Sequence, residues 1–179
     1  DHHRWPLTAD GVSLYWNGLN RGKRSVAADI SDPEIQELLS ELVARAGNFL
    51  TNFPARGWLA YDRLREGRHD LVMVAITGSP DGTTAVDYTI NCAVGYPAGT
   101  GHPDDHRPVN HSLPAWDLIC GQTAALGILA ADRHRSRTGE GQLVGLALAA
   151  TLAAANLKLM GQQAEQCLVC PLLGSQCRS

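Results

Sequence analysis

One carboxylate stands where a long apolar segment begins. Asp117 follows Pro114 and Trp116, and it opens a run of Ala, Leu, Ile and Gly residues that closes in a basic turn at residues 133–142. A carboxylate at a helix N-terminus accepts backbone N–H bonds and meets the positive end of the helix dipole, and both effects keep it ionised. The ionised group can cap the helix, or it can attack an activated acyl group and form a covalent intermediate. From residue type and position alone, we favour the cap.

A cationic loop near the N-terminus is a second candidate site. Arg21, Lys23 and Arg24 follow Gly18 and come just before a β-prone segment. Arginine binds a phosphate as a planar fork and lysine binds it as a point charge, so this loop suits a phosphate group. The glycine patterns of the common nucleotide-binding loops are missing, so a solvated basic loop explains the same residues.

A third candidate site follows the second strand that the sequence predicts. Asn52, Phe53 and Arg56 come at the end of this strand and in the loop after it. Ligands of open α/β folds bind beyond the carboxyl ends of the strands. These three side chains are therefore placed to contact an adenine ring or a phosphate, although an ordinary loop between strand and helix is the alternative.

The segment before Asp117 is rich in Gly, Pro, His and Asp and is expected to be mostly loop. A long loop inside a compact domain is often functional. Its histidines, His102, His106 and His111, are irregularly spaced, which favours surface histidines over a metal site. Asn110 and His111 come shortly before Asp117, so they can line the same pocket.

The five cysteines fall into two groups. Cys92 and Cys120 lie in apolar surroundings, and we expect them to be small core residues. Cys167, Cys170 and Cys177 lie near the C-terminus with a single C-x-x-C pair and no nearby His, so an atypical tail explains them better than a metal site. We therefore expect no metal and a reducing setting.

Composition excludes several functional classes. The chain has 179 residues, 44% of them hydrophobic, and a formal net charge of −3. This length suffices for one domain with a hydrophobic core. A general nucleic-acid binder would usually carry a large basic excess. No apolar run reaches the roughly 20 residues that span a bilayer, and no signal-peptide pattern is visible. We expect a cytoplasmic protein without nucleic-acid or membrane partners.

Strands and helices are expected to alternate along the chain. Pro33 after Ser31-Asp32 favours a helix start, Gly47 favours its end, and the continuous apolar run 71–77 is typical of a strand covered on both faces. Such alternation predicts an α/β fold with an open, mostly parallel, Rossmann-like sheet and helices on both faces. The expected strands are 24–30, 48–52, 71–77 and 143–148, and the expected helices are 33–46, a piece through 61–65, 86–94, 118–133 (buried on most sides) and 149–160.

Five stretches together resemble the class III CoA-transferases (the CaiB/BaiF family). This family includes formyl-CoA transferase, carnitine CoA-transferase and α-methylacyl-CoA racemase. The stretches occur in the family's order and cover about residues 15–156. They are LNRGKRSVAADI, TNFPARG, LVMVAITG, VDYTINCAVGYPAGTG and WDLICGQTAALGILAADRHRSRTGEGQ.

The resemblance implies an enzyme whose nucleophile is Asp117, which reverses the preference for a plain cap. It implies coenzyme A, carried as an acyl-CoA substrate, and no metal. It also implies two further groups of residues. The CoA-binding residues would be Arg21, Lys23, Arg24, Asn52, Phe53 and Arg56, and the substrate pocket would contain Tyr88, Asn110 and His111.

Two branches of the family differ in chemistry. The racemase branch removes and returns an α-proton with a His just before an Asp-Tyr-like pair, and Val86 stands in that place here, which argues against racemisation. The runs TAVDYTINCAVGYPAGTG and PVNHSLPAWD resemble the branch that moves CoA between the two carboxyls of 2-methylfumaryl-CoA (mesaconyl-CoA). Intermolecular CoA transfer, racemase-type chemistry and an inactive CoA-binding fragment remain the alternatives.

The resemblance also predicts how the chain is organised. Residues 1–156 would form a partial Rossmann-like CoA-transferase domain, and residues 157–179 an atypical C-terminal tail, with the family's second domain missing. Family members form interlocked dimers. We therefore expect a fragment of a protein that is a homodimer when full length.

Overall fold

The computed structural model describes residues 3–100, 104–105 and 107–149. The chain divides into two compact units, Asp1–Gln36 and Glu37–Ser179. The helices are α1 (Leu14–Leu19), α2 (Pro33–Ala46), α3 (Tyr61–Gly67), α4 (Asp87–Ala93) and α5 (Ala115–Thr138), the 3-10 helices are η1 (Gly57–Leu59) and η2 (Tyr96–Gly99), and the strands are β1 (Asn48–Thr51), β2 (Val72–Thr77) and β3 (Gln142–Ala147).

The first unit contains α1 and an extended segment. The buried Ser13 caps α1 by accepting a hydrogen bond from the Trp16 amide through its side-chain oxygen. The strand expected at residues 24–30 is wrong, because these residues are exposed along their whole length and do not form a strand. A β-prone segment becomes a strand only where a neighbour supplies backbone partners and one face is buried, and these residues have no buried face.

Helix α2 begins and ends at the residues that the sequence predicts. Pro33 is its first residue, and the Asp32 carboxylate accepts the Glu34 amide at 2.9 Å. Gly47 follows its end with φ of 72°, a left-handed conformation that favours glycine, and donates its amide to the Val43 carbonyl at 2.9 Å.

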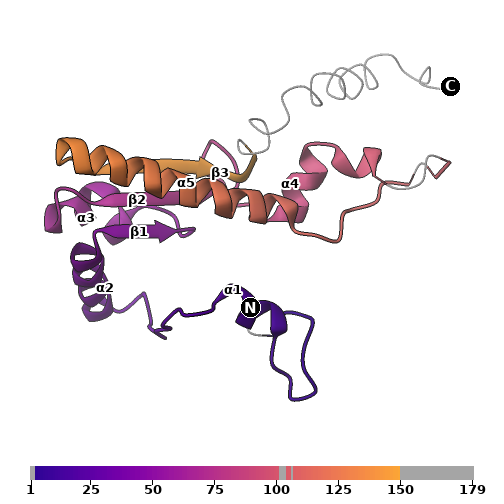
Figure 1. The fold of residues 1–179 in the computed structure, drawn as a ribbon, viewed down its shortest axis with the longest axis horizontal. Coiled ribbons are helices and arrows are strands. Elements are labelled where there is room, and N and C mark those ends of the chain that lie inside the picture. Colours follow the sequence, from indigo (N-terminus) through magenta and orange to yellow (C-terminus); the bar gives the residue numbers. More distant parts are fainter. Residues whose placement is uncertain (1–2, 101–103, 106, 150–179) are drawn as a thin grey trace, which may run out of the picture. The chain divides into compact units, whose positions relative to one another are not determined.

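A three-stranded parallel sheet forms the centre of the second unit (Figure 1). The strand order is β1-β2-β3, with Asn48 beside Val72 and Val72 beside Gln142. The central strand is the apolar run that the sequence indicates, and residues 71–74 are fully buried. Its hydrophobicity follows from its position, since a central parallel strand contacts apolar neighbours on both faces.

Helices cover both faces of the sheet, as expected. Met73 of β2 packs with Val43 of α2 and Leu64 of α3. On the opposite face, Ile76 packs against the cluster that contains Trp116 and Cys120 of α5. Adjacent residues of a strand point to opposite faces, so one short strand serves both layers. Figure 1 shows α5 running along β2 and β3.

Helix α5 is longer and less buried than expected. Its 24 residues span Ala115–Thr138, whereas the sequence predicts 118–133. Ala124 and Ala131 are buried, but Leu126 and Leu129 are 66% and 67% exposed, so the expectation of burial on most sides is wrong. The helix contacts the sheet through one face, and small side chains at that face allow close approach.

Several expectations fall outside the described residues. They are the helix at 149–160, apart from its first residue, and the tail at 157–179. The division into a domain at 1–156 and a tail therefore stays a prediction. Within the described part of the chain, no helix combines the length and the hydropathy that crossing a bilayer requires.

Gly141 precedes β3 where two backbones come very close. A Cβ at this position would lie 2.1 Å from the Leu71 carbonyl oxygen. We expect Gly141→Ala to lower the free energy of unfolding by roughly 1–3 kcal/mol, because the backbone of β2 or β3 must shift. Gly145→Ala is the matched control, since among the described residues no atom lies within 4 Å of a Cβ there. Urea denaturation of both variants checks this, and equal stability losses would contradict it.

Candidate functional site

Asp117 is the third residue of α5 and is exposed. The helix begins near the carboxyl ends of β2 and β3, because Trp116 and Cys120 belong to the cluster that contacts Ile76 and Leu146. This is the edge where open parallel sheets bind ligands. An exposed carboxylate at this place can meet a substrate.

The first-turn amides of α5 are bound by a carboxylate from another helix. Asp87 Oδ2 accepts hydrogen bonds from the backbone amides of Trp116 at 2.7 Å and Asp117 at 3.1 Å. Asp87 is the first residue of α4 and is 2% exposed. The cap that the position of Asp117 suggests is thus supplied by Asp87.

His111 lies behind this cap. Its Nε2 atom is 3.5 Å from Asp87 Oδ1, within ion-pair distance. The ring centroid is 5.7 Å from that of Tyr88 and 6.1 Å from that of Trp116, and the ring meets Trp116 edge-on at 83°. These contacts fix the imidazole beside the start of α5.

A second set of polar contacts connects α4 to α5 and to the loop that precedes α5. The Trp116 indole Nε1 donates to Asn91 Oδ1 at 2.9 Å, and Asn91 donates through its amide nitrogen to Asn110 Oδ1. The Tyr88 hydroxyl is 3.4 Å from the Ser112 carbonyl oxygen, to which it donates. All three residues expected in the substrate pocket, Tyr88, Asn110 and His111, thus lie around the N-terminus of α5.

The loop after β1 starts at the same carboxyl edge of the sheet. Asn52, Phe53 and Arg56 are exposed, and the Phe53 amide donates to Thr51 Oγ1 at 3.0 Å. Arg56 directly precedes η1. These side chains are on the edge that Asp117 occupies, and their contact with a nucleotide stays a prediction.

The cationic loop belongs to the first unit. Arg21, Lys23 and Arg24 are exposed, and Lys23 Nζ donates to Asn20 Oδ1 at 3.0 Å. Their exposure leaves the guanidinium and ammonium groups accessible to an anion. Their role toward CoA phosphates stays a prediction.

Comparison with known proteins shows the family of the chain. A model described as CoA-transferase family III matches residues 1–169 of the chain. The chain belongs to this family.

The relatives include one isomerase and several CoA-transferases. The chain is 56% identical to 2-methylfumaryl-CoA isomerase of Chloroflexus aurantiacus over 153 residues, which is 83% of this chain and 37% of that protein. It is 35% identical to succinate–glutarate CoA-transferase of Agrobacterium fabrum, over 79% of this chain and 38% of that protein. The chain thus spans about two fifths of the length of these curated relatives.

A solved structure has the same fold. A CAIB/BAIF family protein from Brucella suis matches with a TM-score of 0.76 and 28% identity, over 94% of this chain and 47% of that chain. The α/β architecture expected from the family III resemblance is therefore confirmed.

Sequence reasoning missed two residues that hold the first turn of α5 in this family III chain. Asp87 and Asn91 are both buried on α4, and each binds α5. The sequence offers one hint: both polar residues lie on the same face of α4 as Ile90, which is buried. The partner of each side chain is 25 or more positions away along the chain, so local patterns do not reveal it.

The two described cysteines of this family III chain differ in environment. Cys120 is buried one turn after Asp117, and burial, followed by the charge of Asp117, raises the pKa of its thiol. Cys92 is exposed, so its expected place in the core is wrong. Helix α4 turns its buried face, with Asp87, Ile90 and Asn91, toward the interior and leaves Cys92 outside.

Alkylation should separate these two thiols. Only the thiolate reacts, and both burial and a raised pKa reduce the thiolate of Cys120. We expect iodoacetamide at mildly alkaline pH to modify Cys92 roughly tenfold faster or more. Peptide mapping by mass spectrometry measures both rates, and equal rates would contradict this assignment of burial.

Metal ligands do not gather in the described part of this family III chain. Among its described residues, no three His, Cys, Asp or Glu side chains come together as a metal site. His102, His106, Cys167, Cys170 and Cys177 lie outside the described residues.

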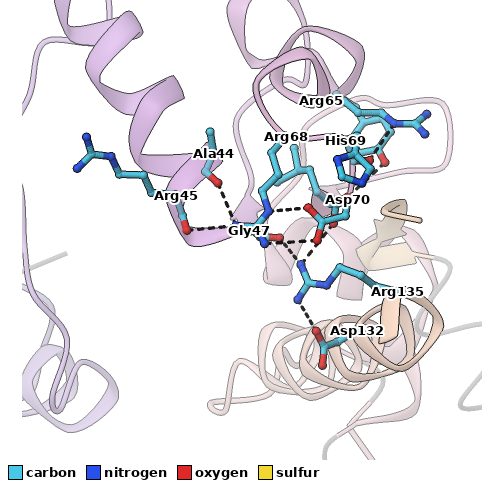
Figure 2. A network of polar contacts seen from close by, with 11 residues as sticks. Ala44, Arg45, Gly47, Arg65, Arg68, His69, Asp70, Asp132 and Arg135 are labelled. Atoms are coloured by element: carbon cyan, nitrogen blue, oxygen red, sulfur yellow. Dashed lines mark hydrogen bonds and ion pairs between the residues drawn. The ribbon is translucent and has the colours of Figure 1, made fainter. Parts of the chain in front are cut away.

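The basic turn at the C-terminal end of α5 stabilises the fold. Arg135 and Asp117 are 18 residues apart along one helix, which corresponds to about 27 Å. The Arg135 guanidinium donates to the Gly47 carbonyl at 2.7 Å and to the Asp70 carbonyl at 3.4 Å, and it also pairs with Asp132 (Figure 2). Arg135 thereby ties the end of α5 to the residues just before β1 and β2.

Arg68 strengthens the same corner of the second unit. It pairs with Asp70 at 2.7 Å and donates to the Ala44 and Arg45 carbonyls at the end of α2, at 3.1 and 3.2 Å (Figure 2). Its hydrogen bond is the main cause that lowers the pKa of Asp70. The arginines of this corner satisfy carbonyls at the amino edge of the sheet, opposite the candidate site.

Proposed function

We propose that the full-length protein transfers CoA between carboxylates through a covalent intermediate on Asp117. The preferred reaction moves CoA from one carboxyl to the other of 2-methylfumaryl-CoA. The observation that carries this proposal is the exposed Asp117 carboxylate in the first turn of α5, whose first-turn amides are already bound by Asp87. Family membership and the 56% identity to a 2-methylfumaryl-CoA isomerase support it.

The proposed reaction begins with attack of the Asp117 carboxylate on the thioester carbonyl. The C–S bond breaks, CoA thiolate leaves, and a mixed anhydride forms between Asp117 and the acyl group. The thiolate then attacks the Asp117 carbonyl of the anhydride. The C–O bond breaks, the substrate leaves as a carboxylate, and Asp117 holds CoA as a thioester.

Two further steps return CoA to the substrate. A carboxylate attacks the Asp117 thioester and expels CoA thiolate, which gives a second anhydride. The thiolate then attacks the substrate carbonyl and regenerates the Asp117 carboxylate. In the intramolecular reaction, the attacking carboxylate is the other carboxyl of the same molecule. Each step exchanges one activated acyl group for another, so we propose coenzyme A without a metal.

The remaining predicted residues receive roles in binding. We propose that Asn52, Phe53 and Arg56 contact the nucleotide end of CoA, because they lie at the carboxyl edge of the sheet with Asp117. The exposed cations of the Arg21–Arg24 loop would contact its phosphates. Tyr88, Asn110 and His111 would line the substrate pocket.

We also propose the cellular setting that family III membership suggests. The partners would be an acyl-CoA and a carboxylate, with no nucleic acid or membrane involved. The full-length protein would be a cytoplasmic, interlocked homodimer.

An isotope experiment distinguishes the possible reactions. The full-length protein is incubated with unlabelled 2-methylfumaryl-CoA and an excess of deuterated free 2-methylfumarate, and the two thioester isomers are separated by chromatography. Intramolecular transfer predicts an unlabelled isomer, whereas intermolecular transfer predicts a deuterated thioester. If the starting isomer persists and no thioester gains deuterium, the protein does not transfer CoA, and CoA binding alone remains as its function.

A separate incubation tests the racemase alternative. A 2-methylacyl-CoA in deuterated water would gain deuterium at its α-carbon if a base removed the proton. We expect no uptake, because the position of the racemase histidine holds Val86, which is 65% exposed and carries no base.

A further inference from the structure

Asp87 is a buried carboxylate to which the proposed reaction assigns no role. It is 2% exposed, and its Oδ2 atom accepts two backbone amides of α5. Burial of a charged group is costly unless partners compensate it on all sides. The helix N-terminus compensates one oxygen through its amides and its dipole. The other oxygen, Oδ1, points elsewhere and needs its own partner.

His111 is the group that faces this oxygen. Its Nε2 atom faces Asp87 Oδ1 at 3.5 Å, and both atoms, together with His111 Nδ1, are buried without a hydrogen bond among the described residues. A carboxylate beside an imidazole selects the form of the ring that carries a proton on the facing nitrogen. Tyr88 and Trp116 hold the ring in this orientation. His111 can therefore contribute ring surface to a pocket while its Nε2 atom faces Asp87.

This arrangement has a consequence for Asp117. A carboxylate in the first turn of a helix tends to bind the N-terminal amides, and such hydrogen bonds stabilise its charged form. A carboxylate stabilised in this way is a weaker nucleophile. In this structure the amides of Trp116 and Asp117 donate to Asp87, and the Asp117 amide is the backbone group of the nucleophile's own residue.

We propose that Asp87 and His111 form a positioning pair for Asp117. Asp87 holds the first turn of α5 and occupies the amides that would otherwise bind the Asp117 carboxylate, and His111 holds Asp87 in place. In this role the pair acts through the Asp117 backbone and not by contact with the reacting atoms. The inference rests on the proposed function, because it concerns how Asp117 is oriented for attack.

Variants of Asp87 test the first part of the pair in the full-length protein. We expect Asp87→Ala to lower kcat about 100-fold with KM changed less than about threefold, because a nucleophile displaced by a fraction of an ångström loses rate more than binding. Asp87→Asn keeps a side-chain oxygen that can accept both amides. It should recover roughly tenfold of the lost kcat.

Variants of His111 test the second part with a matched design. His111→Phe keeps a ring between Tyr88 and Trp116 but removes the donor that faces Asp87. His111→Gln keeps a donor near the position of Nε2. We expect His111→Phe to lower kcat roughly tenfold at nearly constant KM, and His111→Gln to recover most of that loss.

Thermal unfolding and free-CoA binding separate positioning from a merely structural role. The proposal requires Asp87→Asn and His111→Phe to bind free CoA with wild-type affinity while kcat falls. Wild-type kcat in both variants would overturn it, and so would a kcat loss that only parallels lost CoA binding. If Asp87→Ala does not fold, these two variants decide the outcome.

The Asp117→Ala variant keeps this test apart from the proposed function. If Asp117→Ala retains CoA transfer, the covalent mechanism fails and the positioning pair fails with it. If Asp117→Ala is inactive while Asp87→Asn and His111→Phe are fully active, only the pair is refuted.

Discussion

Replacing Asp117 with Asn in the full-length protein should reduce CoA transfer roughly 10³-fold or more. The amide has nearly the shape of the carboxylate but cannot attack a thioester as an anion. The backbone of residue 117 still donates to Asp87, so the helix start should persist. Steady-state rates with 2-methylfumaryl-CoA, combined with circular dichroism to verify folding, measure this effect.

A matched acid on another helix provides the control. Asp62 is an exposed acid in the first turn of α3, as Asp117 is in the first turn of α5. Asp62→Asn removes the same charge from an equivalent helix position and should leave the rate within about twofold. A similar loss in both variants, or more than a tenth of the activity in Asp117→Asn, would contradict the role of Asp117 as nucleophile.

Replacing Arg135 with Met should lower the free energy of unfolding by about 2–4 kcal/mol. Its side chain is 16% exposed and ties α5 to the Gly47 and Asp70 carbonyls (Figure 2). Methionine keeps much of the aliphatic length but leaves these acceptors without their charged donor. Urea denaturation measures the change.

Arg137 is the control for this change. It lies in the same last turn of α5 and is exposed, and in the described part of the chain no hydrogen bond or ion pair is found for its side chain. Arg137→Met should change stability by no more than about 0.5 kcal/mol. Equal losses in the two variants would refute the assignment of the basic turn to the fold.

The parts of the fold that the sequence predicts are those set by local chemistry. Pro33 and Gly47 bound α2 because one fixes a helical φ and the other accepts a left-handed one. Residues 71–77 were predictable as a central strand because a strand covered on both faces has to be apolar throughout. These signals need no knowledge of distant residues.

The errors arise where distant residues decide. Residues 24–30 have strand-forming side chains, but they are exposed and do not form a strand. The apolar composition of α5 does not reveal that Ala124 faces the interior while Leu126 and Leu129 face outward. Pairing and burial depend on tertiary neighbours, which residue composition does not specify.

The candidate site also contains one residue that the sequence indicates and one that it does not. Asp117 could be singled out because its place at the start of an apolar helix is visible along the chain, and the family resemblance then favoured the nucleophile over the cap. Asp87 could not, because nothing local tells which acid caps which helix. Its hydrogen bonds to α5 span about 30 positions of sequence. The structure was needed to show that Asp87 caps α5.

The most direct measurement is capture of the covalent intermediate. The full-length protein is mixed with 2-methylfumaryl-CoA, and hydroxylamine is added to trap activated acyl groups as hydroxamates. Peptide mass spectrometry then locates the modified residue. We expect a hydroxamate on Asp117 that forms only when the CoA substrate is present. CoA transfer that proceeds while Asp117 remains unmodified, or a hydroxamate on another residue, would contradict the covalent role of Asp117.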